Sequence, residues 1–313
     1  MRCSIVIPVN NERDNLPILH EELQELIKAE DRVHEVIWVD DGSTDGSSRW
    51  LRDTVSDRHK ALFLRSNFGQ SAAMKAGLDC ADGNVIVFMD GDAQNDPEDV
   101  PDLLNRLQEG NDVVSGWRKD RKGSYLRRVL PSQIANGVIS YTTGVKLHDY
   151  GCSLKAYRAE ILEDLPLYGQ LHRFLPALAS WKGIEVEEIP VSDRPRQHGT
   201  SHYGLGRTWE VLMDLLIVKF LIDYRFRPIR IFGRVSLYLF LMMTLGGIYL
   251  GYLKIYANQS LSDHALTTVT VLFGLVGMQS LILGMLGEQQ ARMYTKASGE
   301  EPYAIRQTVN VSD

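Results

Sequence analysis

The sequence predicts an α/β domain with a mostly parallel sheet, followed by amphipathic interfacial helices and a hairpin of two membrane-spanning helices. Short apolar segments alternate with amphipathic helical patterns through the first half of the chain, as in sheets whose strands are joined by helices. Several of these segments end in carboxylates, and two long runs without acidic residues lie near the C-terminus. The composition, 44% hydrophobic and 24% charged with a net charge of −6, excludes a disordered chain and gives no sign of a nucleic-acid partner.

The elements of the domain are expected in a regular order. Apolar runs predict strands at residues 3–9, 36–39, 61–64, 85–89, 112–118 and 185–190. Helices are expected between them: one with an apolar stripe from Leu16 to Ile27, one from about Ser47, one that follows residues 67–69 and ends near Gly83, and one from Pro97 to about Glu109. The helices of such a chain cover both faces of the sheet.

The strand at residues 85–89 is the one around which the chain is organised, because Asp90, Asp92 and Gln94 follow it directly. Carboxylates at the end of a buried strand need a compensating cation or hydrogen-bond donors. Ligands of open α/β sheets bind outside the carboxyl ends of the strands. Hard oxygen ligands suit Mg²⁺ or Mn²⁺ holding a diphosphate. A polar turn after a strand is the alternative that this motif alone leaves open.

Two other strands also end in polar residues. The second strand runs into Asp40 and Asp41, and the strand at residues 112–118 ends in Arg118, which begins a basic run to Arg128. That run is either a solvated face or a phosphate-binding segment. The glycine-rich fingerprints of dinucleotide-binding and phosphate-loop proteins are both absent from the sequence.

The C-terminal third predicts a multi-pass protein of the inner or plasma membrane. Residues 235–256 and 265–287 are each long enough to cross a hydrocarbon core of about 30 Å. Arginines precede the first run and basic residues follow the second, so the positive-inside rule predicts that both termini are cytoplasmic. Apolar residues from Trp209 to Phe220 recur at helical spacing, which favours a helix in the interface plane over a core-facing helix. The three cysteines form no C-x-x-C pair, which argues against a disulfide framework or a zinc site and suits the cytosol.

Four regions are therefore expected. They are a cytoplasmic catalytic domain at residues 1–206, interfacial helices at residues 207–230, two transmembrane helices at residues 231–288 and a cytoplasmic tail at residues 289–313. The alternation of residues 302–309 is compatible with a strand that pairs between subunits, with a frayed terminus as the alternative.

With these features together the sequence resembles glycosyltransferase family 2 with a GT-A catalytic domain. More narrowly it is similar to the bacterial polyprenyl-phosphate glycosyltransferases and the dolichyl-phosphate mannose synthases. The matching motifs lie at residues 7–12, 39–45, 67–69, 90–94 and 196–203, and the resemblance extends over nearly the whole chain. The sequence departs from the family at three positions: Asn10 stands where Tyr is frequent, Gly91 where Ala is frequent, and His202 where Lys is common. The last departure matters most, because a histidine need not be charged at neutral pH.

The resemblance implies a role for each matching residue. Nucleotide-sugar binding is implied for Pro8, Asn10, Glu12, Asp41, Asp90 and Gly91. Metal binding, of Mg²⁺ or Mn²⁺, is implied for Asp92 and Gln94, and a catalytic role for Asp92, Asp149 and Arg118. Binding of the acceptor phosphate is implied for Arg196, Ser201 and His202. The partners implied are a UDP- or GDP-linked sugar, a polyprenyl phosphate lipid, the membrane and further copies of the chain, as a homo-oligomer such as a tetramer.

The reaction expected is an inverting transfer of sugar to polyprenyl phosphate. A phosphate monoester is largely a dianion at pH 7, so it needs a cationic clamp that aligns it more than a strong base. Two alternatives remain, a synthase of the same family and a protein of a different class. A processive polysaccharide synthase usually has more spans and a Gln-x-x-Arg-Trp motif, which is absent here. A non-catalytic membrane scaffold would not be expected to retain Asp41, Asp90, Asp92 and Gln94 together.

Overall fold

The structure, a computed structural model, divides into two compact units, Met1–Val218 and Lys219–Asp313, which are described separately. The residues that it describes are 1–55, 58–119, 137, 139–140, 144–163, 165, 167, 171–181, 183–195, 228–256 and 265–298.

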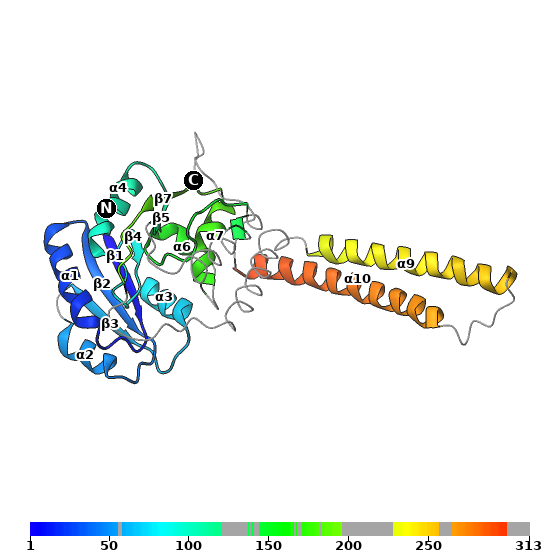
Figure 1. Cartoon of the computed structure of the whole chain (residues 1–313), viewed down its shortest axis with the longest axis horizontal. Coiled ribbons are helices and arrows are strands. Elements are labelled where there is room, and N and C mark those ends of the chain that lie inside the picture. The colour runs from blue at the N-terminus through cyan, green and yellow to red at the C-terminus, as the bar shows by residue number, and fades with distance from the viewer. Residues whose placement is uncertain are drawn as a thin grey trace. The chain divides into compact units, whose positions relative to one another are not determined.

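The first unit is built on a seven-stranded sheet with the order β3-β2-β1-β4-β6-β5-β7 (Figure 1). The strands are β1 (Cys3–Val9), β2 (Val33–Asp40), β3 (His59–Phe63), β4 (Val85–Phe88), β5 (Val113–Trp117), β6 (Lys155–Arg158) and β7 (Val186–Pro190). The strands β1 to β4 pair in parallel, and β5 and β7 are parallel to one another. Only β6 is antiparallel to its two neighbours, β4 and β5, among the strands that the structure describes.

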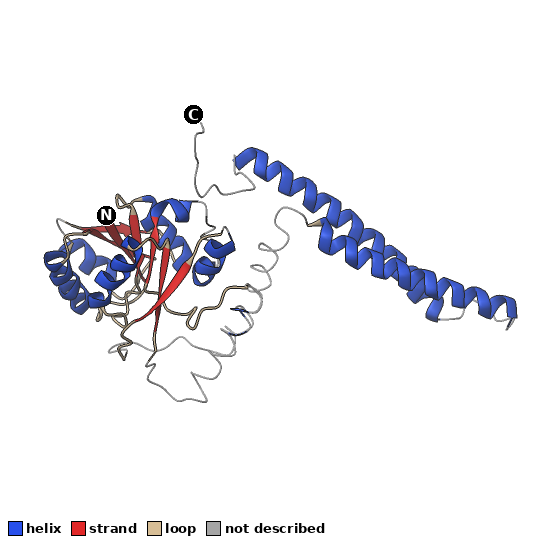
Figure 2. Ribbon diagram, turned by 90° about the horizontal axis from the view of Figure 1, so that it is seen from above, coloured by secondary structure: helices blue, strands red, loops and turns tan. Residues whose placement is uncertain are grey.

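Helices cover both faces of this sheet (Figure 2). The helices α1 (Leu16–Ala29), α2 (Ser47–Thr54) and α4 (Val100–Gln108), the last preceded by the 3₁₀ turn η1 (Pro97–Asp99), contribute leucines to one core cluster. The opposite face is covered by α3 (Gln70–Asp79), which contacts η3 (Leu171–Phe174), and η3 leads into α7 (Leu175–Trp181). A short helix, α6 (Ala159–Glu163), follows β6.

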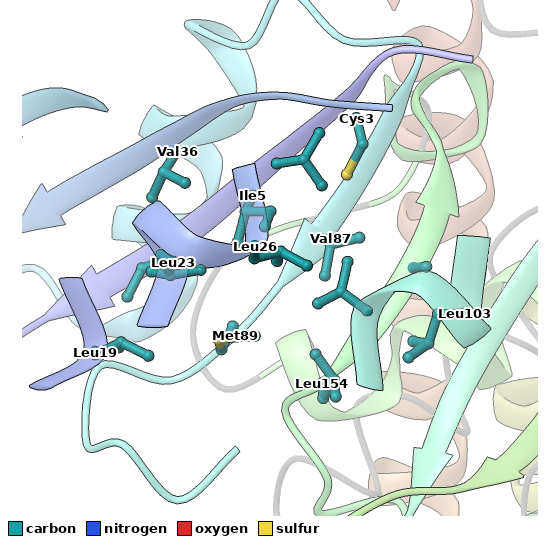
Figure 3. Close-up of a cluster of buried hydrophobic side chains, with 14 of the residues drawn as sticks. Cys3, Ile5, Leu19, Leu23, Leu26, Val36, Val87, Met89, Leu103 and Leu154 are labelled. Carbon is teal, nitrogen blue, oxygen red and sulfur yellow. The ribbon is translucent and has the colours of Figure 1, made fainter. Parts of the chain in front are cut away.

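The core forms because helical and strand periodicities coincide on one face of the sheet. In α1 the leucines at positions 16, 19, 23 and 26 recur at helical spacing and are all buried. They pack against alternate residues of β1, among them Cys3 and Ile5, and Figure 3 shows this cluster continuing to Val87 and Leu103. This packing fixes the sheet beneath the ends of its strands, where the polar residues lie.

The expected strands are confirmed, with ends that differ by at most three residues, the largest difference being the start of β2 at Val33. The α/β class with a mostly parallel sheet is confirmed as well. One strand, β6, was not anticipated from the sequence. It is only four residues long and begins with a lysine, so it lacks the apolar run typical of a buried strand. Because β6 is antiparallel, its first residue lies at the same edge of the sheet as the carboxyl ends of β4 and β5.

The second unit contains a hairpin of two long helices, α9 (Ile229–Tyr256) and α10 (Ala265–Ser298). They lie side by side and antiparallel: Phe232 lies close to Gly284, and Met243 to Gly274. The Ser280 hydroxyl donates a hydrogen bond to the Phe232 carbonyl at 3.1 Å. By length and composition both helices are candidate membrane spans, as expected for residues 231–288. The expected interfacial helix from Trp209 and the tail at residues 302–309 lie outside the described residues.

Candidate active site

The expected site residues that the structure describes lie where the parallel strands end. We call this edge of the sheet, formed by the carboxyl ends of the parallel strands and the amino end of β6, the active edge. In the sheet β1 lies between β2 and β4, and β6 lies between β4 and β5. The segments that follow β1, β2, β4 and β5 therefore lie next to one another, as in other open α/β sheets that bind ligands.

Asp41 joins the segments that follow β1, β2 and β3. Its carboxylate is buried and accepts hydrogen bonds from the backbone N–H groups of Phe68, at 2.7 Å, and Gly69, at 2.9 Å. Its carbonyl accepts a hydrogen bond from Nδ2 of Asn10 at 2.7 Å. Gly42 follows with φ of +69°, and a Cβ there would lie 2.6 Å from the Ser66 carbonyl carbon, so only glycine fits. Asp41 thus fixes the loop that leads into α3.

The loop after β1 is cross-linked to the loop after β2. Asn11 adopts the left-handed conformation, with φ of +58°, and its Oδ1 accepts a hydrogen bond from the Thr44 N–H at 2.7 Å. The carboxylate of Glu12 accepts a hydrogen bond from Nδ2 of Asn15 at 2.6 Å. Asn10 and Glu12, expected at the nucleotide site, are therefore held on either side of Asn11 in one ordered turn.

The segment after β4 passes directly over the end of β1. A Cβ on Gly91 would lie 3.1 Å from the carbonyl oxygen of Pro8, so the absence of a side chain allows this close approach. Asp90 is half-buried and accepts a hydrogen bond from Nε2 of Gln70, in α3, at 2.7 Å. Asp92 is also half-buried, and its Oδ1 accepts a hydrogen bond from the Gln94 N–H at 3.1 Å.

Gln94 is held in one orientation by Arg194. The backbone N–H of Arg194 donates to the Gln94 carbonyl at 3.0 Å, and Nε2 of Gln94 donates to the Arg194 carbonyl at 3.3 Å. Because a carbonyl can only accept, the amide nitrogen of Gln94 must face Arg194, and Oε1 faces the other way. The Arg194 guanidinium is itself fixed by Glu22 of α1 and by Asp96, each at 2.6 Å.

The donor atoms of Asp92 and Gln94, a carboxylate and an amide oxygen, fit Mg²⁺ or Mn²⁺. Within the described part of the chain no group of three or more His, Cys, Asp or Glu residues gathers as a metal site.

Arg118 and Asp149 form a buried, two-point ion pair at the end of β5. Nε of Arg118 donates to Oδ2 of Asp149 at 2.7 Å, and Nη2 donates to Oδ1 at 3.1 Å. The Gly151 N–H also donates to Oδ1, at 3.0 Å, while the Asp149 N–H donates to Glu188 at 3.1 Å. Burial alone would lower the pKa of Arg118, but the hydrogen bonds and charge of Asp149 outweigh it and raise that pKa. Arg118 keeps its charge, and no hydrogen bond within the described part of the chain uses Nη1 or the second Nη2 hydrogen, which could bind an anion.

Lys155, which sequence reasoning missed, is brought to the same edge by β6. Its side chain is buried, and Nζ donates to the Tyr150 carbonyl at 3.1 Å. Burial lowers the pKa of Lys155 to about 8. The signal in the sequence was a lysine flanked by Leu154 and Ala156, directly after the segment that contains Asp149.

The expected acceptor-binding residues Arg196, Ser201 and His202 lie outside the described residues. The basic run that begins at Arg118 is described only as far as Lys119.

Comparison with known proteins identifies the class to which this fold and site belong. Residues 4–166 match the sequence profile of glycosyl transferase family 2. A dodecaprenyl-phosphate galacturonate synthase from Rhizobium johnstonii is 39% identical over 98% of this chain and 93% of its own length. An undecaprenyl-phosphate 4-deoxy-4-formamido-L-arabinose transferase from Edwardsiella ictaluri is 33% identical over 99% of this chain and 94% of its own length. The chain therefore belongs to glycosyl transferase family 2, and it is a glycosyltransferase.

Solved structures support the fold. Glucosyl-3-phosphoglycerate synthase from Mycobacterium tuberculosis, in complex with Mn²⁺, UDP and glucosyl-3-phosphoglycerate, superposes with a TM-score of 0.56 at 18% sequence identity. The match covers 70% of this chain and 78% of that chain. At this identity the likeness shows the GT-A fold of the first unit and does not extend to substrates.

Proposed function

We propose that this protein transfers a sugar from a nucleotide-diphosphate sugar to a polyprenyl phosphate at the cytoplasmic face of the membrane, with inversion at the anomeric carbon. The observation that carries the proposal is similarity over the whole chain to two enzymes named for prenyl-phosphate acceptors. That similarity includes the region of α9 and α10, the helices that are candidate membrane spans. An acceptor with a long prenyl chain remains in the membrane, so an enzyme with a membrane hairpin suits it.

The donor would bind at the active edge between β1, β2 and β4. Asp41, whose carbonyl is held by Asn10, would bind the base, and Asp90, which is held by Gln70, would contact the ribose or the sugar. Asp92 and Oε1 of Gln94 would hold Mg²⁺ or Mn²⁺ on the diphosphate. When bound, the cation would neutralise the charge of the departing nucleoside diphosphate.

The acceptor phosphate would be held by Arg118. The hydrogen bonds to Asp149 fix the plane of its guanidinium, so the remaining N–H groups present a preset surface to phosphate oxygens. The second pKa of a phosphate monoester is about 6, so the nucleophile is already charged at neutral pH. Both oxygens of Asp149 accept hydrogen bonds from Arg118, so Asp149 is better suited to orient Arg118 than to remove a proton. A single in-line displacement inverts the anomeric centre.

The proposal places the catalytic domain and both termini in the cytoplasm, as the distribution of basic residues predicts. Association of several copies, as a tetramer, stays part of the proposal. Mass measurement in mild detergent, with and without residues 302–309, tests it, and a clean monomer in both forms would contradict it.

The experiment uses the full chain in detergent with undecaprenyl phosphate, Mn²⁺ and a panel of labelled UDP- and GDP-sugars that includes UDP-galacturonic acid. We expect one donor to label an organic-extractable lipid, and we expect EDTA or Asp92→Ala to abolish the labelling. A water-soluble polymer in place of the lipid would instead indicate a processive synthase. Absence of nucleotide binding and of transfer with every donor would indicate a scaffold, and either result would overturn the proposal.

A further inference from the structure

A lysine is buried at the active edge and has no part in the function proposed above. Lys155 is the first residue of β6, where it pairs with Phe88 of β4 and Ser115 of β5. Phe88 lies two positions before Asp90, and Ser115 lies three positions before Arg118. The lysine therefore lies between the strand that leads to the expected donor site and the strand that leads to the expected acceptor clamp.

The contacts of Lys155 do not offset the cost of burying its charge, so the stability of the fold does not explain why a lysine is buried here. The residue is 4% exposed, and within the described part of the chain its one hydrogen bond is from Nζ to the Tyr150 carbonyl, at 3.1 Å. The hydroxyls of Ser115 and Tyr157, which share its face of the sheet, are buried and have no hydrogen-bond partner among the described residues. An ammonium buried with one neutral acceptor costs free energy, and such groups are typical of functional sites.

The charged groups around Lys155 come from the elements packed against it. Asp149, in the turn before β6, and Asp90, in the segment after β4, supply negative charge. Arg118, after β5, supplies positive charge, and the Cys152 thiol is buried nearby. Burial is the largest influence on Lys155 and lowers its pKa to about 8, so the ammonium is the main form at neutral pH.

We propose that Lys155 is a positioning residue for sugar transfer, which holds the Tyr150 carbonyl and so fixes the turn that presents Asp149 to Arg118. This inference rests on the proposed function, because it assigns to Arg118 the binding of phosphate. The turn is then fixed from two sides. Glu188 of β7 accepts the Asp149 N–H at 3.1 Å, and Lys155 of β6 donates to the next residue, Tyr150.

Three variants test the inference in the full-length protein. Lys155→Met removes the charge and the donor while keeping a side chain of similar length, and Lys155→Arg keeps both. Lys60→Met is the matched control, because Lys60 pairs with Glu35 and Asp82 and is half-exposed. Thermal unfolding, hydrogen exchange of residues 149–152 and steady-state transfer kinetics are measured for each.

We expect Lys155→Met to lower kcat by about tenfold or more, the effect of losing one hydrogen bond from a charged donor at the site. The KM for the nucleotide sugar should stay within about twofold, because no donor contact is removed. Exchange at residues 149–152 should become faster, while Tm stays the same or rises because a buried charge is removed. Lys155→Arg should keep most of the activity, and in the wild type kcat should fall above about pH 8, where Lys155 loses its charge.

Each contrary result is decisive. Wild-type kinetics for Lys155→Met, or unchanged exchange at residues 149–152, would overturn the inference. A fall in Tm and activity together in both Lys155 variants would make the lysine a structural residue only. Hydrogen exchange needs no substrate, so it reports on Lys155 even if the wild-type protein transfers no sugar, and the two proposals can fail separately.

Discussion

The ion pair between Arg118 and Asp149 gives the sharpest test of how this site works. In Asp149→Asn one carboxylate oxygen becomes an NH₂ group, which cannot accept a hydrogen bond from the guanidinium. The variant therefore loses at least one of two charge-assisted hydrogen bonds, now 2.7 and 3.1 Å long. Each is worth roughly 1.5–3 kcal/mol, and removing one partner of a buried pair costs about 3–5 kcal/mol.

If about 2–4 kcal/mol of this loss appears in the transition state, kcat falls by roughly 30- to 1000-fold. A lost general base would reduce the rate by a similar factor, about 10²–10⁴, so the size of the effect does not tell whether Asp149 positions Arg118 or acts as the base. A double-mutant cycle with Arg118 separates these two roles. If Asp149 acts only through Arg118, Asp149→Asn should add almost nothing to Arg118→Ala, and the acid limb of the pH–rate profile should remain, because it belongs to the acceptor phosphate.

The assay is lipid labelling at saturating nucleotide sugar from pH 5 to 9, with Asp112→Asn as the control. Asp112 pairs with Arg158 at 3.2 Å at the other end of the sheet, so its loss should leave the kinetics unchanged. Additive losses in the double mutant, or an acid limb that disappears in Asp149→Asn, would refute the positioning role and make Asp149 the base.

Two further predictions concern the metal segment and the sheet. Arg194→Met should raise the Mn²⁺ concentration needed for half-maximal UDP binding by about tenfold, because the backbone of residue 194, which orients Gln94, loses its side-chain anchor to Glu22 and Asp96. Gln94→Glu should do the same, since a carboxylate is repelled by the Arg194 carbonyl, and better Mn²⁺ binding by Gln94→Glu would contradict this. Burial lowers the pKa of His59 to about 4, so the unfolded chain binds more protons between pH 4 and 6.5, and the free energy of unfolding should fall as pH drops through this range, by up to about 3 kcal/mol. Urea unfolding followed by tryptophan fluorescence checks this, and a pH dependence that persists unchanged in His59→Gln would exclude His59 as its cause.

Much of the fold could be predicted from the sequence, because local pattern and tertiary structure agree there. The run Val85–Phe88 is apolar throughout and is buried on both faces, and the leucines of α1 recur at the period that the sheet requires. Asp41, Asp90 and Asp92 follow such strands directly, so their place at one edge followed from the topology of parallel sheets. Their roles in binding stay predictions.

The contacts that arrange the site could not be predicted, because they join residues far apart in the chain. Nothing local to Gln94 indicates that its amide meets the carbonyl of Arg194, and nothing local to Asp41 indicates the N–H groups of Phe68 and Gly69. These are single hydrogen bonds that depend on how loops meet, and they leave no periodic signal in the sequence.

The same limit explains why Lys155 was missed, and it shows what the antiparallel strand contributes. A parallel strand at this place in the sheet would bring its carboxyl end to the active edge and its first residue to the opposite edge. Because β6 runs the other way between β4 and β5, the turn before it, with Asp149 and Tyr150, reaches the active edge together with Lys155. The reversal thus places a carboxylate and an ammonium from one short segment beside the end of β5, where Arg118 lies. In this sheet the direction of one four-residue strand determines which side chains meet that arginine.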